Sequence, residues 1–312
     1  MSHAPNLAVS LGAVQLQNPI LLAAGTAGYG REVAGVIDLE SLGGLVTKAV
    51  SVEVRKGAPS PRVAEFDGGM INAIGLANPG VQAVREEALP WLASNVQRAR
   101  VLVNVVGSRV EDYAAVVSAL HDAPGKAGFE LNVSCPNVKA GGLEFGADRA
   151  ALEAVVRGAR ACTSLPLFVK LSPTLADIAG AANVALDAGA DGLTLTNTLP
   201  GLVIDVERRR PALGFGTGGV SGAALMPAAV LATWRVYRAT KAPIIGVGGV
   251  ASASDALQFL LAGARAVAIG TAAMRDPRIP ERIVRHLAQW MDRHDVTSLE
   301  PIIGSLEWPA PA

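Results

Sequence analysis

The residues most able to do chemistry lie between Phe129 and Asn137, where a short apolar run leads directly into a polar loop that carries a cysteine. The apolar residues of Gly128 to Val133 predict a buried strand, and Pro136, which has no N–H to donate, ends any regular ladder. A thiol is useful where it can be reached and its pKa can be tuned, so Cys135 at a strand-to-loop junction is a candidate catalytic residue. The alternative is that Cys135 is a small buried hydrophobe.

Two lysines are the next candidates, because Lys48 and Lys170 lie within or at the end of other apolar runs. An ammonium group is costly to bury unless something anionic or electron-rich meets it. Two such lysines favour a bound ligand over a structural ion pair. Small or polar residues lie in or just after further apolar runs, namely Ala24, Gly25, Asn104, Asn132, Asn197 and Thr198.

Glycines end the last two apolar runs, as Gly248-Gly249 and as Gly270-Thr271. Residues 252–255 can cap the helix that follows the first of these pairs. Glycine allows a ligand to approach the backbone closely, and backbone N–H groups at a helix N-terminus bind phosphate. The pattern predicts a phosphorylated ligand, and the alternative is that the glycines only make tight turns.

One unit recurs along the chain, an apolar run of four to six residues, then a polar or glycine-bearing junction, then a helical segment. The expected strands are Pro19–Ala23, Gly44–Lys48, Val101–Val106, Gly128–Asn132, Leu167–Leu171, Gly192–Thr196, Ile244–Val247 and Ala266–Ile269. The expected helices are Arg31–Leu42, Pro79–Asn95, Val110–His121, Asp148–Ser164, Leu175–Ala188, Ala223–Thr240, Ala253–Ala262 and Ile279–Asp295. Before them, Leu7–Leu11 and Ala13–Leu16, split by Gly12, predict a hairpin that caps the main fold.

Eight strand-then-helix units with almost continuously apolar strands predict a parallel sheet buried on both faces, closed into a (β/α)8 barrel. A doubly wound sheet is the alternative, but it needs a topological switch point and usually has fewer strands. The longest interruptions, Ala49–Asn78, Val133–Phe145 and Thr198–Gly222, all follow strands. They therefore belong to the barrel face that carries the chemistry. We expect residues 1–312 to form a single domain.

The composition excludes several classes of protein. Among 312 residues, 50% are hydrophobic, 17% are charged and the net charge is zero, which does not suit a nucleic-acid surface. No stretch reaches the roughly 18 apolar residues of a membrane span, and no secretory signal is visible at the start. The cysteines, Cys135 and Cys162, are too few for a disulfide framework and indicate a reducing cytoplasm. Cys162, in a helical pattern, is expected to fill core space.

Other tempting signals do not hold. The run Gly214 to Gly219 precedes no strand-to-helix turn of the dinucleotide type, so we expect a flexible loop at the active site. The four histidines lie near the N-terminus or on expected helices and never end a strand, so we expect no Ser-His-Asp triad. We also expect no metal site, because neither histidines nor cysteines cluster with ligand spacing.

Several short motifs, spread over almost the whole chain, together form a pattern that is highly specific for one protein family. They are Thr47-Lys48, the residues from Asn72 to Gly80, Asn132 to Asn137, Lys170 to Pro173, Thr196 to Thr198, Gly216 to Gly222, Gly246 to Gly249 and Gly270-Thr271. With them the chain resembles the class 1 dihydroorotate dehydrogenases, and among these the catalytic subunit of the 1B type. The fold of that family is an FMN-binding barrel.

The resemblance implies an FMN site and a substrate site. FMN would be held by Ala24, Lys48, Ala49, Asn104, Asn132, Lys170, Thr196, Gly222, Gly248, Gly249, Gly270 and Thr271, the last four of which meet its phosphate. Substrate would contact Lys48, Asn72, Ala73, Ile74, Gly75, Leu76, Asn132, Asn197 and Thr198. Family members often have Ser where this chain has Ala24, so a contact there would come from the backbone.

The implied reaction is oxidation of dihydroorotate to orotate, in which C5 loses a proton and C6 loses a hydride. Cys135 is the expected base and Lys48 a catalytic cation; class 2 members use Ser as the base and add an N-terminal membrane segment. Asparagines can meet the polar edges of a pyrimidine, and lysines stabilise negative charge on reduced flavin and on the substrate carboxylate.

The resemblance also implies a partner. A subunit that carries FAD and a [2Fe–2S] cluster would pass electrons to NAD, in a heterotetramer built around a dimer of this chain. The alternatives are a class 1A-like homodimer that reduces fumarate, another flavin barrel such as the pyrimidine-reducing domain of dihydropyrimidine dehydrogenase, and a non-redox barrel that binds a sugar phosphate. The loop Asn72 to Gly75 resembles the 1B type more closely.

Overall fold

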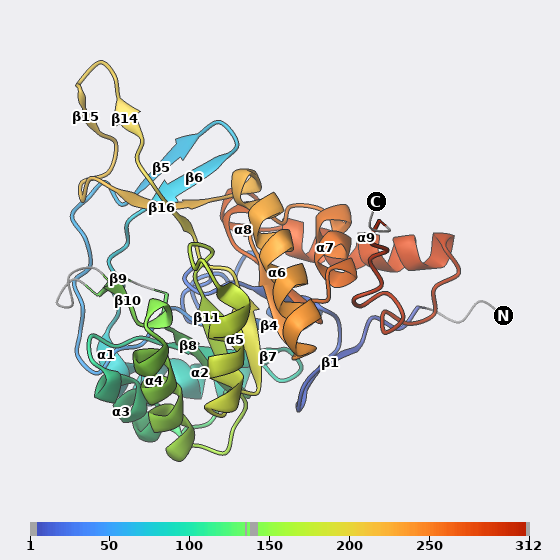
Figure 1. Cartoon of the computed structure of the whole chain (residues 1–312), viewed down its shortest axis with the longest axis horizontal. Helices are drawn as coiled ribbons and strands as arrows, with labels where there is room; N and C mark the ends of the chain where they lie inside the picture. Colours follow the sequence, from blue (N-terminus) through green and yellow to red (C-terminus); the bar gives the residue numbers. More distant parts are fainter. Residues whose placement is uncertain (1–4, 135, 138–142, 310–312) are drawn as a thin grey trace.

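The core of the computed structural model, which describes residues 5–134, 136–137 and 143–309, is a closed barrel of eight parallel strands (Figure 1). In chain order the barrel strands are β3 (Ile20–Leu22), β4 (Gly44–Val46), β7 (Arg100–Val105), β8 (Gly128–Asn132), β11 (Leu167–Leu171), β12 (Gly192–Leu195), β17 (Ile244–Val247) and β18 (Ala266–Ile269). Each pairs with the next and β18 pairs with β3. The predicted (β/α)8 barrel is confirmed.

The strands form where the sequence predicts them because their residues are apolar on both faces. Every residue of β8, β11 and β12 is buried. One face packs inside the barrel and the other packs under the helices, which is the environment of a parallel sheet. The eight predicted apolar runs and the eight barrel strands agree to within two residues at each end.

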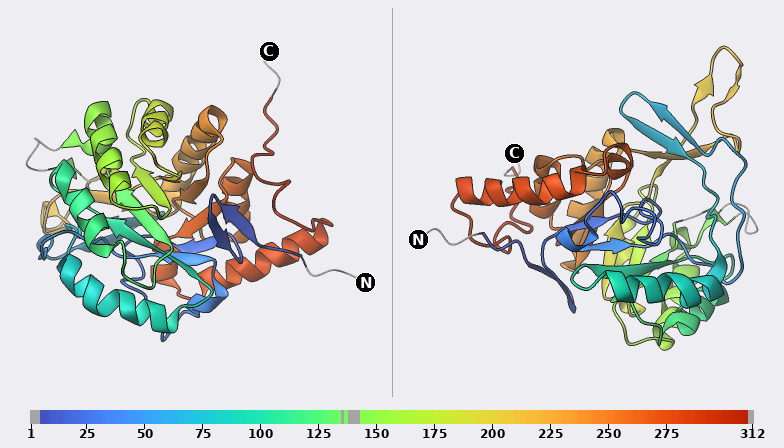
Figure 2. Two further views of the ribbon diagram at one scale, coloured as in Figure 1. Left: turned by 90° about the horizontal axis from the view of Figure 1, so that it is seen from below. Right: turned by 180° about the vertical axis from the view of Figure 1, so that it is seen from behind.

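Helices cover the outside of the barrel, as the two views of Figure 2 show. They are α1 (Gly80–Ala83), α2 (Leu89–Asn95), α3 (Val110–Leu120), α4 (Arg149–Ala161), α5 (Ile178–Asp187), α6 (Met226–Thr240), α7 (Ala253–Leu261), α8 (Thr271–Arg275) and α9 (Ile279–Arg293). A π-helical segment, η2 (Val84–Ala88), joins α1 to α2 just before Pro90, which has no N–H to donate. A 3-10 helix, η5 (Ala223–Leu225), precedes α6.

The helix predicted over residues 31–42 is wrong. The chain there forms consecutive turns, followed by a 3-10 helix, η1 (Leu39–Ser41), whose first turn is capped by the side chain of Asp38. Gly35 and the β-branched Val33 and Val36 lower the helical propensity of this short segment. The short helix α8 was not predicted as a separate element.

A second sheet is built entirely from the long segments that follow β4 and β12. Its strands are β5 (Val63–Phe66), β6 (Gly69–Asn72), β13 (Leu199–Gly201) and β16 (Gly218–Ser221), paired antiparallel in the order β13-β16-β6-β5. A further hairpin of β14 (Ile204–Asp205) and β15 (Arg210–Pro211) projects beyond it (Figure 1). Gly218 and Gly219, predicted in a flexible loop, are instead part of β16. We call these segments, residues 49–78 and 198–222, the insert.

The predicted N-terminal hairpin is confirmed as β1 (Val9–Leu11) and β2 (Val14–Leu16). Its turn at Gly12 lies next to Pro243 and Asp191, which precede barrel strands. The hairpin therefore lies at the amino ends of the strands, opposite the insert. No helix in the described residues is long and apolar enough to cross a bilayer.

Candidate functional site

Four polar side chains are buried at the carboxyl ends of neighbouring barrel strands. Asn104, Asn132, Lys170 and Thr196 are 1%, 7%, 6% and 1% exposed, respectively. They come from β7, β8, β11 and the end of β12, and Asn132 is the register partner of Lys170. A closed parallel barrel brings these strand ends to one face, so the convergence predicted from the sequence is found.

Three of the polar side chains around β8 are linked by hydrogen bonds. Ser134 Oγ donates to Asn132 Oδ1 over 2.8 Å, and Asn197 Nδ2 donates to Ser134 Oγ over 2.6 Å. The backbone carbonyl of Asn132 accepts from the hydroxyl of Tyr113 at 2.9 Å. Thr198 N–H donates to Asn197 Oδ1 at 2.9 Å, so the side-chain amide of Asn197 is also held in place. The result is a fixed array of donors and acceptors directly before Cys135.

The two lysines predicted at the site carry ammonium groups without counter-ions. Lys170 is buried in the barrel and Lys48 is half-buried just beyond β4. Neither ammonium group forms a hydrogen bond or an ion pair with any of the described residues. Leaving a buried cation unpaired is costly, so this arrangement is the one expected of a site that binds an electron-rich or anionic ligand.

Two neutral polar atoms at the same end of the barrel are buried without a hydrogen-bond partner in the described part of the chain. They are Asn104 Oδ1 and Thr196 Oγ1. Native proteins leave few buried polar atoms unsatisfied, because each costs about 1–3 kcal/mol. A ligand that brings a matching donor and acceptor would remove this cost.

Three of the four glycines predicted to hold FMN have backbone conformations that other residues rarely adopt. Gly222, Gly248 and Gly249 have φ angles of 96°, 138° and 76°. A Cβ on Gly249 would lie 2.5 Å from the Cβ of Met226. Gly270 precedes α8, whose first residue, Thr271, donates its hydroxyl to Ser221 Oγ at 2.8 Å. These residues form a glycine-lined cradle in which Gly249 and Gly270 are partly exposed and Gly222 and Gly248 are buried.

The insert places the predicted substrate loop over this end of the barrel. Asn72 ends β6, where its Nδ2 donates to the carbonyl of Gly219 at 3.2 Å. Ala73 N–H donates to the carbonyl of Arg62, and Ile74 carbonyl accepts from Ala58 N–H at 3.0 Å. The chain then turns sharply through Gly75 and Leu76, with φ angles of 67° and 55°.

The two alanines predicted to hold FMN contribute backbone rather than side-chain polarity. Ala24 is half-buried just after β3. Ala49 is buried, and its carbonyl accepts from the hydroxyl of Tyr29 at 3.0 Å. Burial raises the pKa of the Tyr29 phenol, as does the nearby Glu32, so the phenol remains a donor to this carbonyl.

Comparison with known proteins agrees with this geometry. The family model described as dihydroorotate dehydrogenase matches residues 6–291. Relatives named dihydroorotate dehydrogenase B (NAD(+)), catalytic subunit, are similar over nearly their whole length. The protein from Geobacter sp. strain M21 is 46% identical over 97% of this chain and 99% of its own, and that from Desulforudis audaxviator is 47% identical over 96% of each.

The chain belongs to the dihydroorotate dehydrogenase family. It is therefore an enzyme and an oxidoreductase, as its motifs predicted, and the family is one that depends on FMN. The residues predicted from the resemblance to this family occupy one face of the barrel, with one exception. Cys135, the predicted base, lies outside the described residues, although its neighbours Ser134 and Pro136 are within them.

Cys162 was expected to fill core space within a helix, and the structure places it at the end of that helix. It is the C-cap of α4, which ends at Ala161, and it is partly exposed while it packs against the core. The helix stops before the predicted residue 164, and the Arg160 side chain binds the carbonyls of Thr163 and Leu165 that follow.

Two carboxyl groups at the site were missed in the sequence. Glu130 is buried on β8, where its carboxylate accepts from Asn104 Nδ2 and Thr194 Oγ1, each at 2.7 Å. Glu144 accepts from Ser172 Oγ at 3.2 Å, while its Oε2 is buried and has no hydrogen-bond partner among the described residues. A charged residue in an apolar strand drew attention to Lys170, and the same signal was present at Glu130.

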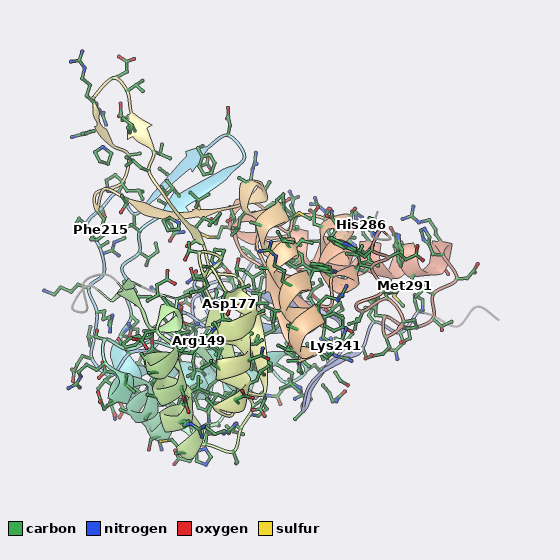
Figure 3. All side chains as sticks on the ribbon, in the orientation of Figure 1. Arg149, Asp177, Phe215, Lys241, His286 and Met291 are labelled. Atoms are coloured by element: carbon green, nitrogen blue, oxygen red, sulfur yellow. The ribbon has the colours of Figure 1, made fainter. Side chains whose placement is uncertain are left out.

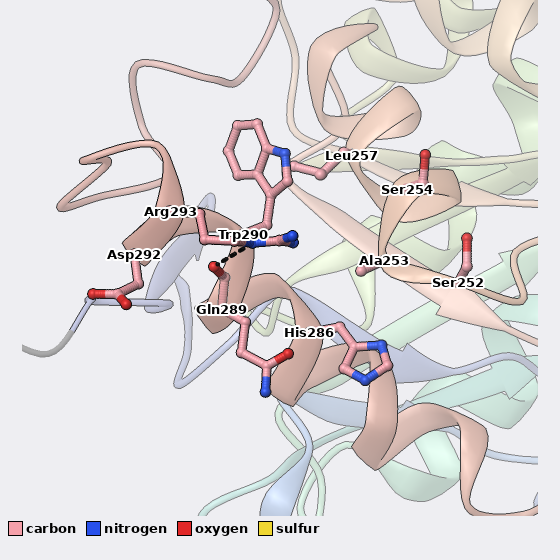
Figure 4. A pocket seen from close by; sticks show the side chains of 9 residues that line it. All are labelled: Ser252, Ala253, Ser254, Leu257, His286, Gln289, Trp290, Asp292 and Arg293. Atoms are coloured by element: carbon pink, nitrogen blue, oxygen red, sulfur yellow. Dashed lines mark hydrogen bonds between the residues drawn. The ribbon is translucent and has the colours of Figure 1, made fainter.

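The protein also has a surface hollow of about 600 Å³, and Figure 4 shows the side chains that line it. It is lined by residues of α9 and of the start of α7, including Ser252, His286 and Arg293, which are exposed. None of its residues belongs to the buried array described above. Among the described residues, no group of three or more His, Cys, Asp or Glu could hold a metal ion.

Proposed function

We propose that the protein oxidises dihydroorotate to orotate in pyrimidine biosynthesis, with FMN bound at the carboxyl face of the barrel. The observation that carries this proposal is the buried Lys170, which has no ionic partner among the described residues and lies beside the linked Asn132, Ser134 and Asn197. A cation and a rigid set of amide groups suit a flavin and a flat, polar dihydropyrimidine.

The residues present fit FMN. The unpartnered Asn104 Oδ1 and Thr196 Oγ1 offer an acceptor and a hydroxyl to a heterocycle, and Lys170 offers a positive charge. Gly248, Gly249, Gly270 and Thr271 would meet the phosphate through backbone N–H groups, with Gly222 beside them. Ala24, Lys48, Ala49 and Asn132 complete the proposed site. When bound, FMN would supply an acceptor for the hydride that leaves C6 of dihydroorotate.

The substrate would lie between the barrel and the insert. Asn72, Asn132 and Asn197 would bind the polar edges of the pyrimidine, with Thr198 beside them, and residues 73–76 would cover it. Lys48, half-buried and without a counter-ion among the described residues, would meet the carboxylate of dihydroorotate. A ring held in this way would have one face free for the proton transfer that we propose for Cys135.

The proton at C5 would be taken by Cys135. The residue directly follows Ser134, which is buried and bonded to Asn132 and Asn197, so the loop begins from a fixed point. Farther along, Pro136 pairs with Glu144 in a short antiparallel ladder. These contacts hold the two described residues on either side of Cys135, which supports the proposal because a general base must be positioned.

We also propose that electrons leave through a partner subunit. The relatives are named as catalytic subunits of NAD(+)-linked enzymes. The present chain has two cysteines, fewer than the four thiolates of a [2Fe–2S] cluster. A partner that carries FAD and such a cluster, in a heterotetramer around a dimer of this barrel, would complete the path to NAD. The alternative remains a homodimer that reduces fumarate.

The insert supplies a surface for such an assembly. Val206 and Phe215 are 74% and 60% exposed, and Leu202 and Ile204 are exposed nearby. Figure 3 shows Phe215 on the insert, away from the helices of the barrel. Clustered exposed apolar residues mark interaction sites more often than chance.

We also propose that the whole chain, residues 1–312, forms one FMN-binding barrel domain that works in the cytoplasm.

An anaerobic absorption spectrum tests the proposal. The purified protein is expected to carry one FMN per chain, and dihydroorotate is expected to bleach its visible absorption. A colourless protein that cannot be reconstituted with FMN would contradict the proposal and favour a barrel that binds a sugar phosphate. A yellow protein bleached by dihydrouracil but not by dihydroorotate would favour another flavin-dependent dihydropyrimidine oxidoreductase.

A further inference from the structure

A buried carboxylate inside the barrel has no place in the chemistry above. Glu130 is 1% exposed on β8, level with Asn104 on the neighbouring strand β7. It forms no ion pair with any described residue, Lys170 included, so it does not act there as a counter-ion. Its contacts are two short hydrogen bonds, from Asn104 Nδ2 and from Thr194 Oγ1, each 2.7 Å long.

These contacts determine which way the Asn104 amide faces. A carboxylate only accepts hydrogen bonds, so it selects the NH2 group of the neighbouring amide and turns the carbonyl oxygen away. Thr194 holds the second carboxylate oxygen, so Glu130 is fixed at both oxygens. The backbone of Asn104 is also fixed, because its N–H donates to Thr47 Oγ1 at 3.2 Å and its carbonyl accepts from Val50 N–H.

The consequence is that the side chain of Asn104 presents a buried hydrogen-bond acceptor, its Oδ1, to any bound ligand. Asn104 Oδ1 has no partner in the described part of the protein, whereas the Nδ2 of the same amide is satisfied. A ligand atom that fills this position must donate. The ring system of oxidised flavin has a single N–H donor, the imide N3–H, and its remaining polar ring positions accept.

We propose that Glu130 is a positioning residue that orients Asn104 so that its Oδ1 accepts a hydrogen bond from the N3–H of the flavin. The proposal rests on the FMN site proposed above. Glu130 itself does not touch the flavin or the substrate, and it acts through the Asn104 amide. The site thereby selects flavins that carry a free imide N–H.

Binding of FMN and 3-methylflavin mononucleotide to the apoprotein tests this, because methylation removes the N3–H donor and leaves the phosphate. Wild-type apoprotein is expected to bind FMN at least about 10-fold more tightly than the methylated analogue, the effect of one buried acceptor left unpaired. In Glu130→Gln, which can present either end of an amide to Asn104, that ratio is expected to fall toward one. Thr233→Val is the control and should retain the ratio, because it removes a buried hydroxyl that donates to Ala229 within α6, away from Glu130.

A second measurement does not depend on a variant folding. With FMN labelled with ¹⁵N at N3, the wild-type complex should show an N3–H NMR signal that exchanges slowly with water. Rapid exchange in the wild-type complex, equal affinity for the two flavins, or an unchanged ratio in a folded Glu130→Gln protein would overturn the role of Glu130. Failure of the wild-type apoprotein to bind FMN at all would instead contradict the proposed function.

Discussion

Charged side chains in apolar strands mark the site at the scale of single residues. Lys170 on β11 and Glu130 on β8 are both buried, and each costs free energy that packing alone does not return. Lys170 has no partner among the described residues, and Glu130 is bonded to Asn104 and Thr194. The first is therefore suited to meet a ligand directly and the second to act through its neighbour.

Cys135→Ala tests the proposed base. The substitution should leave the flavin spectrum unchanged and slow flavin reduction by dihydroorotate roughly 10²–10⁴-fold, which is the usual contribution of a positioned general base. A free thiol has a pKa of about 8.5, so the wild-type rate should rise with pH as the thiolate forms. Stopped-flow absorbance measures the rate of flavin reduction in the variant and its pH dependence in the wild-type protein. Cys162→Ala is the control, and reduction of Cys135→Ala at nearly wild-type speed would remove Cys135 from the mechanism.

The buried carboxyl group of Glu144 is expected to make the stability of the fold depend on pH. Desolvation raises the pKa of its carboxyl group, against the lowering effect of the Ser172 hydrogen bond. A raised pKa in the folded state means that the protonated form is the one that folding favours. The group costs nothing below its unfolded pKa, and it destabilises the fold as the pH rises through the folded value.

Glu144→Gln should therefore raise the thermal midpoint at neutral pH, because Gln keeps an acceptor for Ser172 and removes the buried charge. The gain should shrink as the pH falls toward about 4, where the wild-type carboxyl group is protonated. Thermal unfolding at several pH values measures it, with the exposed Glu87→Gln as the control. A gain of equal size at every pH would show that the charge is not its cause.

At the scale of elements, the sequence predicts those strands and helices that depend on a local pattern of residues. The eight strands were found from apolar runs, and Asp148 and Ser252 were found at helix N-termini, where each caps its helix through a side-chain oxygen. The insert sheet was not predicted, because it pairs Asn72 with Gly219, far apart in the chain. Residues 31–42 have helical spacing but weak propensity, so tertiary packing determined their turns.

Gly249→Ala tests the proposed phosphate cradle as an element. Its φ of 76° and the 2.5 Å approach of a new Cβ to Met226 Cβ would force the turn after β17 to move. FMN affinity of the apoprotein should fall at least about 10-fold, because phosphate contacts depend on the backbone position. Gly68→Ala is matched, since Gly68 also has a positive φ of 92° but its Cβ would approach nothing closer than 4.0 Å. Fluorescence titration that gives equal losses in both variants would attribute the effect to strain alone.

At the scale of the whole molecule, the barrel is closed at both ends in different ways. The N-terminal hairpin lies at the amino ends of the strands, and the insert lies over the carboxyl ends. Apolar side chains remain exposed on the insert, where Val206 and Phe215 project into solvent. The insert therefore lies over the end of the barrel at which we propose the flavin site, and it presents a surface that suits another protein.

The isolated chain is expected to reduce NAD slowly or not at all. A hydride delivered to a buried flavin must leave again, and transfer to NAD requires a dinucleotide site and an electron path. The sequence has no strand-linked GxGxxG motif with its acidic residue, and its two cysteines cannot supply the four thiolates of an iron–sulfur cluster.

Assays of the purified chain with dihydroorotate and either NAD or fumarate separate the two proposed assemblies. Rapid NAD reduction by the chain alone would refute the need for a partner, and rapid fumarate turnover would favour the homodimer. Bleaching by dihydroorotate with neither turnover is the result expected of a catalytic subunit that requires an FAD and iron–sulfur partner.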